Sequence, residues 1–277
     1  MSFDETVLIA GAGIGGMALG VALQRAGIKY EIFERVASLR EVGAGILVQA
    51  GAMRALRHIG LESEVVSSGC ELERGTGRNV AGTLLSTTRF EELGAPTVAI
   101  QRGRLHSALL GALEHGRVHL DRAVSDFEQD EHGVRALFED GSRSSLGGLL
   151  IGADGLHSAV RRRLFGDTPT RYAGYTSWRG VAPCAGLVPA GEILEVWGRG
   201  LRFGAVSLGP HETYWFAVAN AAPGEFDGDH RATVLARFAH FSDAALALVR
   251  ATPASAILRT DIEDRKPIPA WSRGRVS

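Results

Sequence analysis

The chain has 277 residues, of which 45% are hydrophobic, and its 30 basic and 31 acidic side chains leave a formal net charge of −1. This length suffices for one large domain or two smaller ones with a hydrophobic core. The charge balance excludes a general attraction to nucleic acid or to anionic membranes.

Residues 6–24 carry no charge, a length close to that of a short membrane-spanning helix. Glycines interrupt the middle of this run, two acidic residues precede it, and its periodicity changes from that of a strand to that of a helix. Cys70 and Cys184 stand far apart in no metal or redox spacing. We therefore expect a cytoplasmic protein with no membrane span and with reduced, apolar cysteines.

The first predicted elements are a strand, a glycine-rich turn, a helix and a second strand. TVLIA is a short aliphatic run typical of a buried parallel strand, and MALGVALQRAG predicts a helix that ends at Gly27. KYEIFER predicts the second strand, which ends at Glu34. Between them lies the spacing Gly11-x-Gly13-x-x-Gly16.

Each part of this opening suits a dinucleotide. Gly11 permits the tight turn, Gly13 lets a pyrophosphate approach the backbone, and Gly16 lets the helix pack close to the strand. The helix N-terminus offers free N–H groups to phosphates, and Glu34 can accept hydrogen bonds from a ribose diol. A 2′-phosphate beside Glu34 would be repelled, which disfavours NADP here. The motif leaves FAD and NAD open, and an ordinary glycine-rich turn that binds nothing is the alternative.

Further along, the chain alternates between short helices and strands. We predict a second glycine-rich turn at 43–45, followed by a strand and by a helix with Met53, Leu56 and Ile59 on one face. A further helix holds Arg102 and Arg104 in its first turn. Short strands follow, with turns at 130–133 and 139–142, and another helix comes after GGLLIGADG. From about residue 168 the pattern alternates as antiparallel strands do, and the antiparallel sheet that it predicts holds three of the four tryptophans. Residues 230–250 predict one amphipathic helix.

Four stretches together resemble the single-component flavoprotein aromatic hydroxylases, the group typified by p-hydroxybenzoate and salicylate hydroxylases. They are GAGIGG with Glu34 and Arg35, GAGI at 43–46, QRGRLHSALL at 101–110 and LLIGADGLHSAVRRRL at 149–164. The stretch GLRFGAVSLGPHETYWFAVAN is most similar to the branch of FAD-dependent urate hydroxylase and zeaxanthin-epoxidase-like monooxygenases. The resemblance covers essentially the whole chain.

The resemblance implies an α/β fold with two domains. A Rossmann-like FAD-binding domain with a parallel sheet is expected at residues 1–68 and 98–167, with 271–277 as the start of its last strand. An antiparallel-sheet substrate domain is expected at 69–97 and 168–270. Family members continue past a strand like RGRVS into a Gly-Asp segment, whereas this sequence ends at Ser277. We therefore expect a C-terminally truncated domain that binds FAD poorly.

The resemblance also implies roles for matching residues. The ADP half of FAD is assigned to Gly11, Ala12, Gly13, Ile14, Gly15, Gly16, Glu34 and Arg35. Arg102 is expected at the ribityl–pyrophosphate region, Leu47 near the flavin, Val124 at the adenine, and Asp154 between the pyrophosphate and the access of NAD(P)H. Taken singly, Arg102 is better interpreted as a solvated cation at a helix start, and Asp154 as a turn residue at the end of a strand. Their occurrence together in the order of the family favours the cofactor roles.

The activity that the resemblance implies follows from its cofactor. NAD(P)H reduces FAD, O2 adds to form a C4a-hydroperoxide, and one oxygen passes to an aromatic or conjugated small molecule by hydroxylation or epoxidation. No metal is needed, and the nine histidines show no metal-ligand spacing, so we interpret them as surface or packing residues. Nucleic acid is not an expected partner, and a homodimer is left open.

On the substrate side, Arg202 and Tyr214 lie on the two arms of one predicted hairpin. They match a substrate-orienting pair of the urate-hydroxylase branch, in which arginine pairs with an anion and tyrosine holds a ring nitrogen or a water. An exposed strand arginine and a packed tyrosine are the plain alternative. The letters YWFA depart from the urate enzymes, which speaks against urate itself. Two other functions stay open: a non-catalytic flavin- or nucleotide-binding remnant and, more weakly, an NAD-dependent dehydrogenase.

Overall fold

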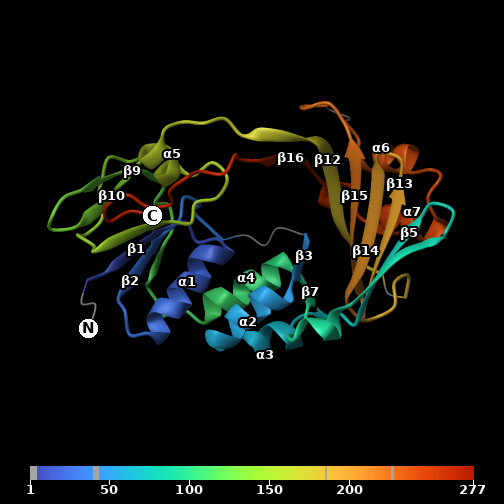
Figure 1. The fold of residues 1–277 in the computed structure, drawn as a ribbon, viewed down its shortest axis with the longest axis horizontal. Coiled ribbons are helices and arrows are strands. Elements are labelled where there is room, and N and C mark those ends of the chain that lie inside the picture. The colour runs from blue at the N-terminus through green and yellow to red at the C-terminus, as the bar shows by residue number, and fades with distance from the viewer. Residues whose placement is uncertain (1–4, 40–43, 185, 226–227) are drawn as a thin grey trace. The chain divides into compact units, whose positions relative to one another are not determined.

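The computed structural model describes residues 5–39, 44–184, 186–225 and 228–277 (Figure 1). The chain divides into two units: Met1–Arg40, His106–Arg171 and Asp264–Ser277 form the first, and Glu41–Leu105 with Tyr172–Glu263 form the second. Among the described residues, no helix combines the length and the apolar character that a bilayer crossing requires.

The first unit is built on a parallel sheet in the order β11-β1-β2-β8. Its strands are β1 (Val7–Ala10), β2 (Tyr30–Phe33), β8 (Val118–His119) and β11 (Leu149–Gly152). All four residues of β1 are buried, as the aliphatic run predicts, and α1 (Ile14–Arg25) leads from β1 to β2.

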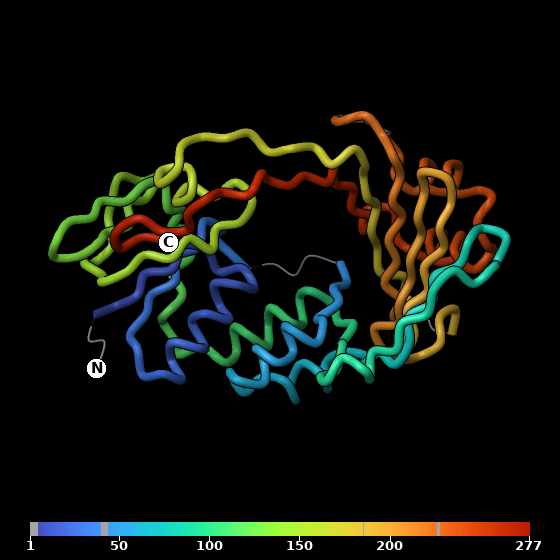
Figure 2. The backbone as a smooth tube through the Cα atoms, viewed as in Figure 1, coloured from blue at the N-terminus to red at the C-terminus, as the bar shows by residue number. Residues whose placement is uncertain are grey.

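The last residues of the chain extend this sheet beyond β11. Val276 forms a parallel bridge with Leu150, and the Gly152 N–H donates to the Ser277 carbonyl at 2.7 Å. Figure 2 shows this C-terminal stretch beside the strand that precedes α5 (Ala159–Phe165). Three parallel strand ends therefore lie side by side, at Ala10, Gly152 and Ser277.

A β-hairpin completes the first unit, as the turn residues predict. Strands β9 (Val124–Gln129) and β10 (Val134–Phe138) are antiparallel, and the Asp130 carboxylate accepts the N–H groups of His132 and Gly133 in the turn between them. The hairpin packs with β11 and α5 around a core that includes Phe127, Phe138, Leu150, Val160 and Leu164.

The second unit contains a seven-stranded sheet in the order β16-β12-β15-β14-β13-β5-β6. The strands are β5 (Arg74–Asn79), β6 (Leu84–Arg89), β12 (Arg171–Ala182), β13 (Glu192–Gly198), β14 (Leu201–Gly209), β15 (Glu212–Asn220) and β16 (Leu258–Asp264). Strands β12, β15, β14 and β13 pair antiparallel, while β13 pairs parallel to β5. The predicted α/β fold, with one parallel and one largely antiparallel sheet, is confirmed.

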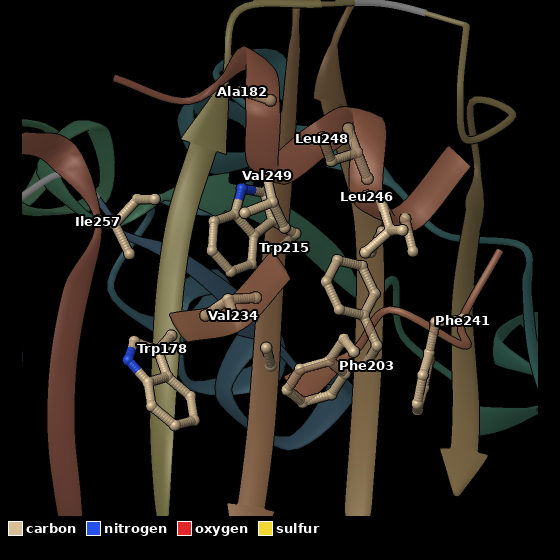
Figure 3. Close-up of a cluster of buried hydrophobic side chains, with 14 of the residues drawn as sticks. Trp178, Ala182, Phe203, Trp215, Val234, Phe241, Leu246, Leu248, Val249 and Ile257 are labelled. Atoms are coloured by element: carbon tan, nitrogen blue, oxygen red, sulfur yellow. The ribbon is translucent and has the colours of Figure 1, made fainter. Parts of the chain in front are cut away.

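One face of this sheet is covered by two helices, α6 (His230–Arg237) and α7 (Asp243–Ala251). Figure 3 shows the apolar side chains between the sheet and these helices, including Trp178, Phe203 and Trp215. The prediction of a single helix over 230–250 is wrong. Phe238 and Phe241 both point into this core, with their ring centroids 5.0 Å apart. The Ser242 hydroxyl then accepts the Ala245 N–H and caps the start of a new helix.

The opposite face of the sheet packs against a smaller one, formed by β3 (Gly45–Val48), β7 (Val98–Gln101) and β4 (Cys70–Glu71). Ala44, Leu72 and Ala99 share a core with Val206 and Tyr214. The remaining helices are α2 (Ala50–His58), α3 (Glu62–Ser67), α4 (Arg102–Gly111), η1 (Phe90–Leu93) and η2 (Ala254–Ala256). Of the predicted second glycine-rich turn, Gly43 lies outside the described residues.

That shared core affects the division of the chain. Residues 41–68 and 98–105 group with the second unit, whereas we predicted them in the FAD-binding domain. The predicted boundary follows the expected contacts to a cofactor, and the observed grouping follows the packing of β3 and β7 on the large sheet.

Candidate functional site

The glycine-rich turn is closed on one side and open on the other. Gly11 has φ +105°, and a Cβ there would lie 2.5 Å from the Ala153 carbonyl oxygen. A Cβ on Gly16 would lie 1.9 Å from the Gly11 carbonyl oxygen. In contrast, a Cβ on Gly13 or Gly15 would have no atom within 4 Å. The strand and helix thus pack backbone to backbone, and the open side leaves room for a ligand at Gly13.

Helix α1 begins at this open side with free backbone donors. Gly13 is its N-cap residue and provides no side-chain hydrogen bond, and the first helical bond runs from the Met17 N–H to the Gly13 carbonyl. The preceding N–H groups are therefore available to an anion, which the helix dipole also favours. Ile14 and Gly15 lie in this first turn.

Glu34 lies where the sequence predicts an acidic residue, directly after β2. Its carboxylate accepts the Ala12 N–H at 2.8 Å and the Val36 N–H at 3.2 Å. The acidic side chain therefore reaches back to the glycine-rich turn, as a ribose-binding residue must. Arg35 follows Glu34 and is exposed.

His106 also contacts this turn, and the sequence interpretation missed it. Its Nε2 lies 3.0 Å from the Ala12 carbonyl oxygen, so the peptide groups of Ala12 are held by Glu34 on one side and His106 on the other. We interpreted the histidines as surface or packing residues. The available signal was the position of His106 inside QRGRLHSALL, one of the stretches that carry the family resemblance.

Asp154 is brought beside Gly11 from a distant part of the sequence, because β11 is the neighbour of β1. Its Oδ2 accepts the Ala159 N–H at 2.7 Å and the Val160 N–H at 3.3 Å, which caps α5. Its Oδ1 is buried and has no hydrogen-bond partner in the described structure. A structural role as a cap is therefore visible, and one carboxylate oxygen is left to accept a further donor.

The other predicted cofactor residues lie on separate elements. Val124 is the first residue of β9 in the first unit. In the second unit, Leu47 of β3 pairs with Ala99 of β7, and Arg102 opens α4, exposed, with its N–H donating to the Ala44 carbonyl at 2.8 Å.

Arg202 and Tyr214 share one face of the seven-stranded sheet. Arg202 pairs with Val218, Gly204 with Phe216, and Val206 with Tyr214. Side chains of paired residues lie on the same face, and their neighbours Phe203 and Trp215 lie on the other, against α6 and α7 (Figure 3). We call the face of Arg202, Tyr214 and Phe216 the front face.

Two aromatic rings lie near Arg202 on the front face. Its guanidinium carbon lies 5.3 Å from the Trp197 ring centroid and 5.4 Å from that of Phe216. The Glu195 carboxylate lies 3.7 Å from Nη1 of Arg202 and accepts the Trp197 indole N–H at 3.1 Å. The ring of Phe216 fits here because Gly204 has no side chain; a Cβ on Gly204 would lie 2.1 Å from that ring. This arrangement can hold a planar ring by stacking.

Tyr214 lies at the buried end of the front face. Its ring packs on the backbone of Gly45, where a Cβ would lie 2.3 Å from the Tyr214 Cγ. Burial raises the pKa of Tyr214, and the positive charge of Arg179 opposes that shift. The hydroxyl therefore remains protonated near neutral pH and can donate a hydrogen bond.

The FAD binding domain family matches residues 4–221 of this chain. Aurachin C monooxygenase/isomerase of Stigmatella aurantiaca is 45% identical over 280 residues, which cover 99% of this chain and 73% of the relative. The 2-heptyl-3-hydroxy-4(1H)-quinolone synthase of Pseudomonas aeruginosa is 32% identical over 281 residues, which cover 98% of this chain and 72% of the relative. The crystal structure of Klebsiella pneumoniae HpxO complexed with FAD and uric acid has a TM-score of 0.91 and 29% identity, and the match covers 99% of this chain and 72% of that one.

Proposed function

Because this chain belongs to the FAD-dependent aromatic hydroxylase family of monooxygenases, we propose that it inserts one oxygen atom of O2 into a planar heteroaromatic ring, with NAD(P)H as the reductant. The observation that carries the proposal is the open glycine-rich turn, with Glu34 on one flank and the uncapped start of α1 on the other.

The residues of the first unit fit FAD. The backbone at Gly13 leaves space for a pyrophosphate, and the free N–H groups of α1 would bind its oxygens. Glu34 would bind the adenosine ribose, since its carboxylate already reaches the turn. Asp154 has one buried oxygen without a partner, which would accept a donor from the cofactor side or from a water.

When bound, the flavin supplies the redox chemistry that activates O2, so the chain itself has to bind, orient and desolvate. We assign orientation of the ring to the front face. Arg202 and Phe216 would stack on it, and the protonated Tyr214 hydroxyl would donate a hydrogen bond to one of its acceptors.

A fused bicyclic ring with an oxygen substituent is the substrate class that we propose. Two observations support it: a relative is named for a hydroxylated 4-quinolone, and a structural neighbour binds uric acid. The partly buried Phe216 and the exposed Trp197 offer flat apolar surface of a matching kind. Residues Arg35, Leu47, Arg102 and Val124 remain proposed cofactor contacts.

The test is a flavin titration of the purified chain followed by an oxidation assay. We expect FAD to bind weakly, and at saturating FAD we expect 2-heptyl-4(1H)-quinolone to stimulate NAD(P)H oxidation and to yield a product heavier by one oxygen atom. Heavy-isotope O2 should label that product. A chain that binds FAD without ring-stimulated oxidation would support the non-catalytic alternative, and oxidation of an alcohol with NAD would support a dehydrogenase.

A further inference from the structure

The front face carries a second arginine to which no role has been assigned. Arg179 of β12 lies opposite Phe216 of β15 in the antiparallel register. The preceding residue, Trp178, points into the helix-covered core (Figure 3). Because side chains alternate along a strand, Arg179 lies on the front face together with Phe216 and Arg202. Phe216 therefore has an arginine on each neighbouring strand.

The two arginines differ in their charge environment. The charge of Arg202 is compensated by Glu195, 3.7 Å away, and its guanidinium is flanked by the rings of Trp197 and Phe216. Glu195 is held in place because it also accepts the Trp197 indole N–H. Arg202 is thus suited to stack on a ring, and the nearby carboxylate weakens its attraction for a second anion.

Arg179 has no such compensation. No carboxylate of the described residues lies within ion-pair distance of its guanidinium. Its Nε donates to the Ser177 hydroxyl at 3.4 Å, and Ser177 is itself buried, which fixes the near side of the guanidinium. The two terminal nitrogens make no hydrogen bond to a described residue. These two terminal nitrogens, which can bind a carboxylate in a bidentate manner, are therefore free among the described residues.

Another polar group of the front face lies close to Arg179. Tyr214 is on β15, two residues from Phe216, and the positive charge of Arg179 acts to lower the pKa of its hydroxyl, against the effect of burial. At the opposite end, Glu212 is paired with Arg104 and does not compensate Arg179. Within the described part of the chain, the front face therefore presents the uncompensated cation of Arg179 and the Tyr214 hydroxyl beside the ring of Phe216.

We propose that Arg179 is the specificity-determining residue for an anionic oxygen, a carboxylate or an enolate, on the substrate ring, while Arg202 orients the ring by stacking. The inference rests on the proposed function, because it assumes that the ring binds on the front face. It assigns the charge of the substrate to a different arginine from the one that the hairpin alone suggests.

The test compares two rings that differ in one group. The probes are 4-hydroxyquinoline-2-carboxylate, which is anionic, and 4-hydroxy-2-methylquinoline, which is neutral. Calorimetric titration of the FAD-saturated chain gives a Kd for each, and the ratio of the two is the readout. We expect Arg179→Gln to weaken the carboxylate probe by about 10–100-fold relative to the neutral one, as for a lost hydrogen-bonded charge pair. Arg202→Gln should weaken both probes by a similar factor.

Further variants separate recognition from folding. Arg179→Lys keeps the charge without the fork and should retain part of the preference. Glu195→Gln should free Arg202 and raise the relative affinity for the carboxylate by several-fold. Glu192→Gln is the matched control, because Glu192 lies on the same strand, on the other face, paired with Arg74. It should leave the ratio unchanged.

Two outcomes would overturn the inference alone. One is an unchanged ratio in Arg179→Gln with both probes still bound, and the other is loss of the carboxylate preference in Arg202→Gln instead. Failure of the wild-type chain to bind either probe would overturn the proposed function, and the inference with it.

Discussion

Gly16→Ala is the substitution that most directly tests the geometry of the glycine-rich turn. A Cβ at this position would lie 1.9 Å from the Gly11 carbonyl oxygen and 3.3 Å from the Ala153 Cβ. The nearest atom belongs to the backbone, so it cannot move aside as the end of a long side chain can. Either α1 must shift away from β1 by more than about 1 Å or the turn at Gly11 must deform.

The expected cost follows from two opposing effects. Overpacking of a buried contact costs about 1–3 kcal/mol, and alanine favours a helix over glycine by up to about 1 kcal/mol. We expect Gly16→Ala to lower the free energy of unfolding by about 2 kcal/mol. Gly15→Ala is the matched control, because Gly15 is exposed in the same helix turn and its Cβ would have no atom within 4 Å. It should be neutral or stabilising by a few tenths of a kcal/mol.

The assay is urea denaturation followed by far-ultraviolet circular dichroism. Tryptophan fluorescence is unsuitable on its own, since three of the four tryptophans lie in the second unit. Gly16→Ala should lower the urea concentration at the unfolding midpoint, whereas Gly15→Ala should leave that midpoint unchanged or raise it slightly. A Gly16→Ala chain as stable as the wild type would refute the reasoning, because it would mean that the close approach of α1 to the turn does not exist.

Three further predictions concern other parts of the molecule. Glu34→Ala should weaken FAD binding by about 1–3 kcal/mol, the effect of losing a charged hydrogen bond, and an unchanged Kd in a flavin titration would contradict the assignment. Thr252→Val should lower the unfolding free energy by about 1–3 kcal/mol, because the buried Trp215 indole N–H donates to the Thr252 hydroxyl at 2.8 Å; equal denaturation midpoints would show that the bond contributes nothing. Burial raises the pKa of Tyr214, so the unfolded chain loses this proton first and stability should fall as pH rises from about 10 towards the raised pKa. Tyr214→Phe should make that alkaline decline shallower, and a pH series of midpoints identical to that of the wild type would count against it.

The sequence by itself determined most of the local elements. The glycine spacing fixed the turn between β1 and α1, and Gly11 does adopt a positive φ of +105°. Alternating side chains determined the β14–β15 hairpin, and Asp130 with Gly133 determined the turn between β9 and β10. These features follow from residues close together in the chain, whose conformational preferences act within a few positions.

Tertiary packing decided the rest. The pattern over 230–250 fits one helix, but the chain leaves the helical path between α6 and α7. There Phe238 and Phe241 are buried in the core between the sheet and the two helices, and this burial stabilises the fold more than a continuous helix would. Residues 41–68 look like part of a nucleotide-binding domain, but β3 packs its backbone at Gly45 on the ring of Tyr214.

The residues of the proposed site show the same division. The contact of Glu34 with the glycine-rich turn was predictable, because a strand, a helix and a strand bring the two together within one local unit. His106 contacts Ala12 across 94 positions of sequence, and Arg179 faces Phe216 only through the register of β12 with β15. Register and the order of strands in a sheet depend on the packing of whole faces, which no local stretch of sequence specifies.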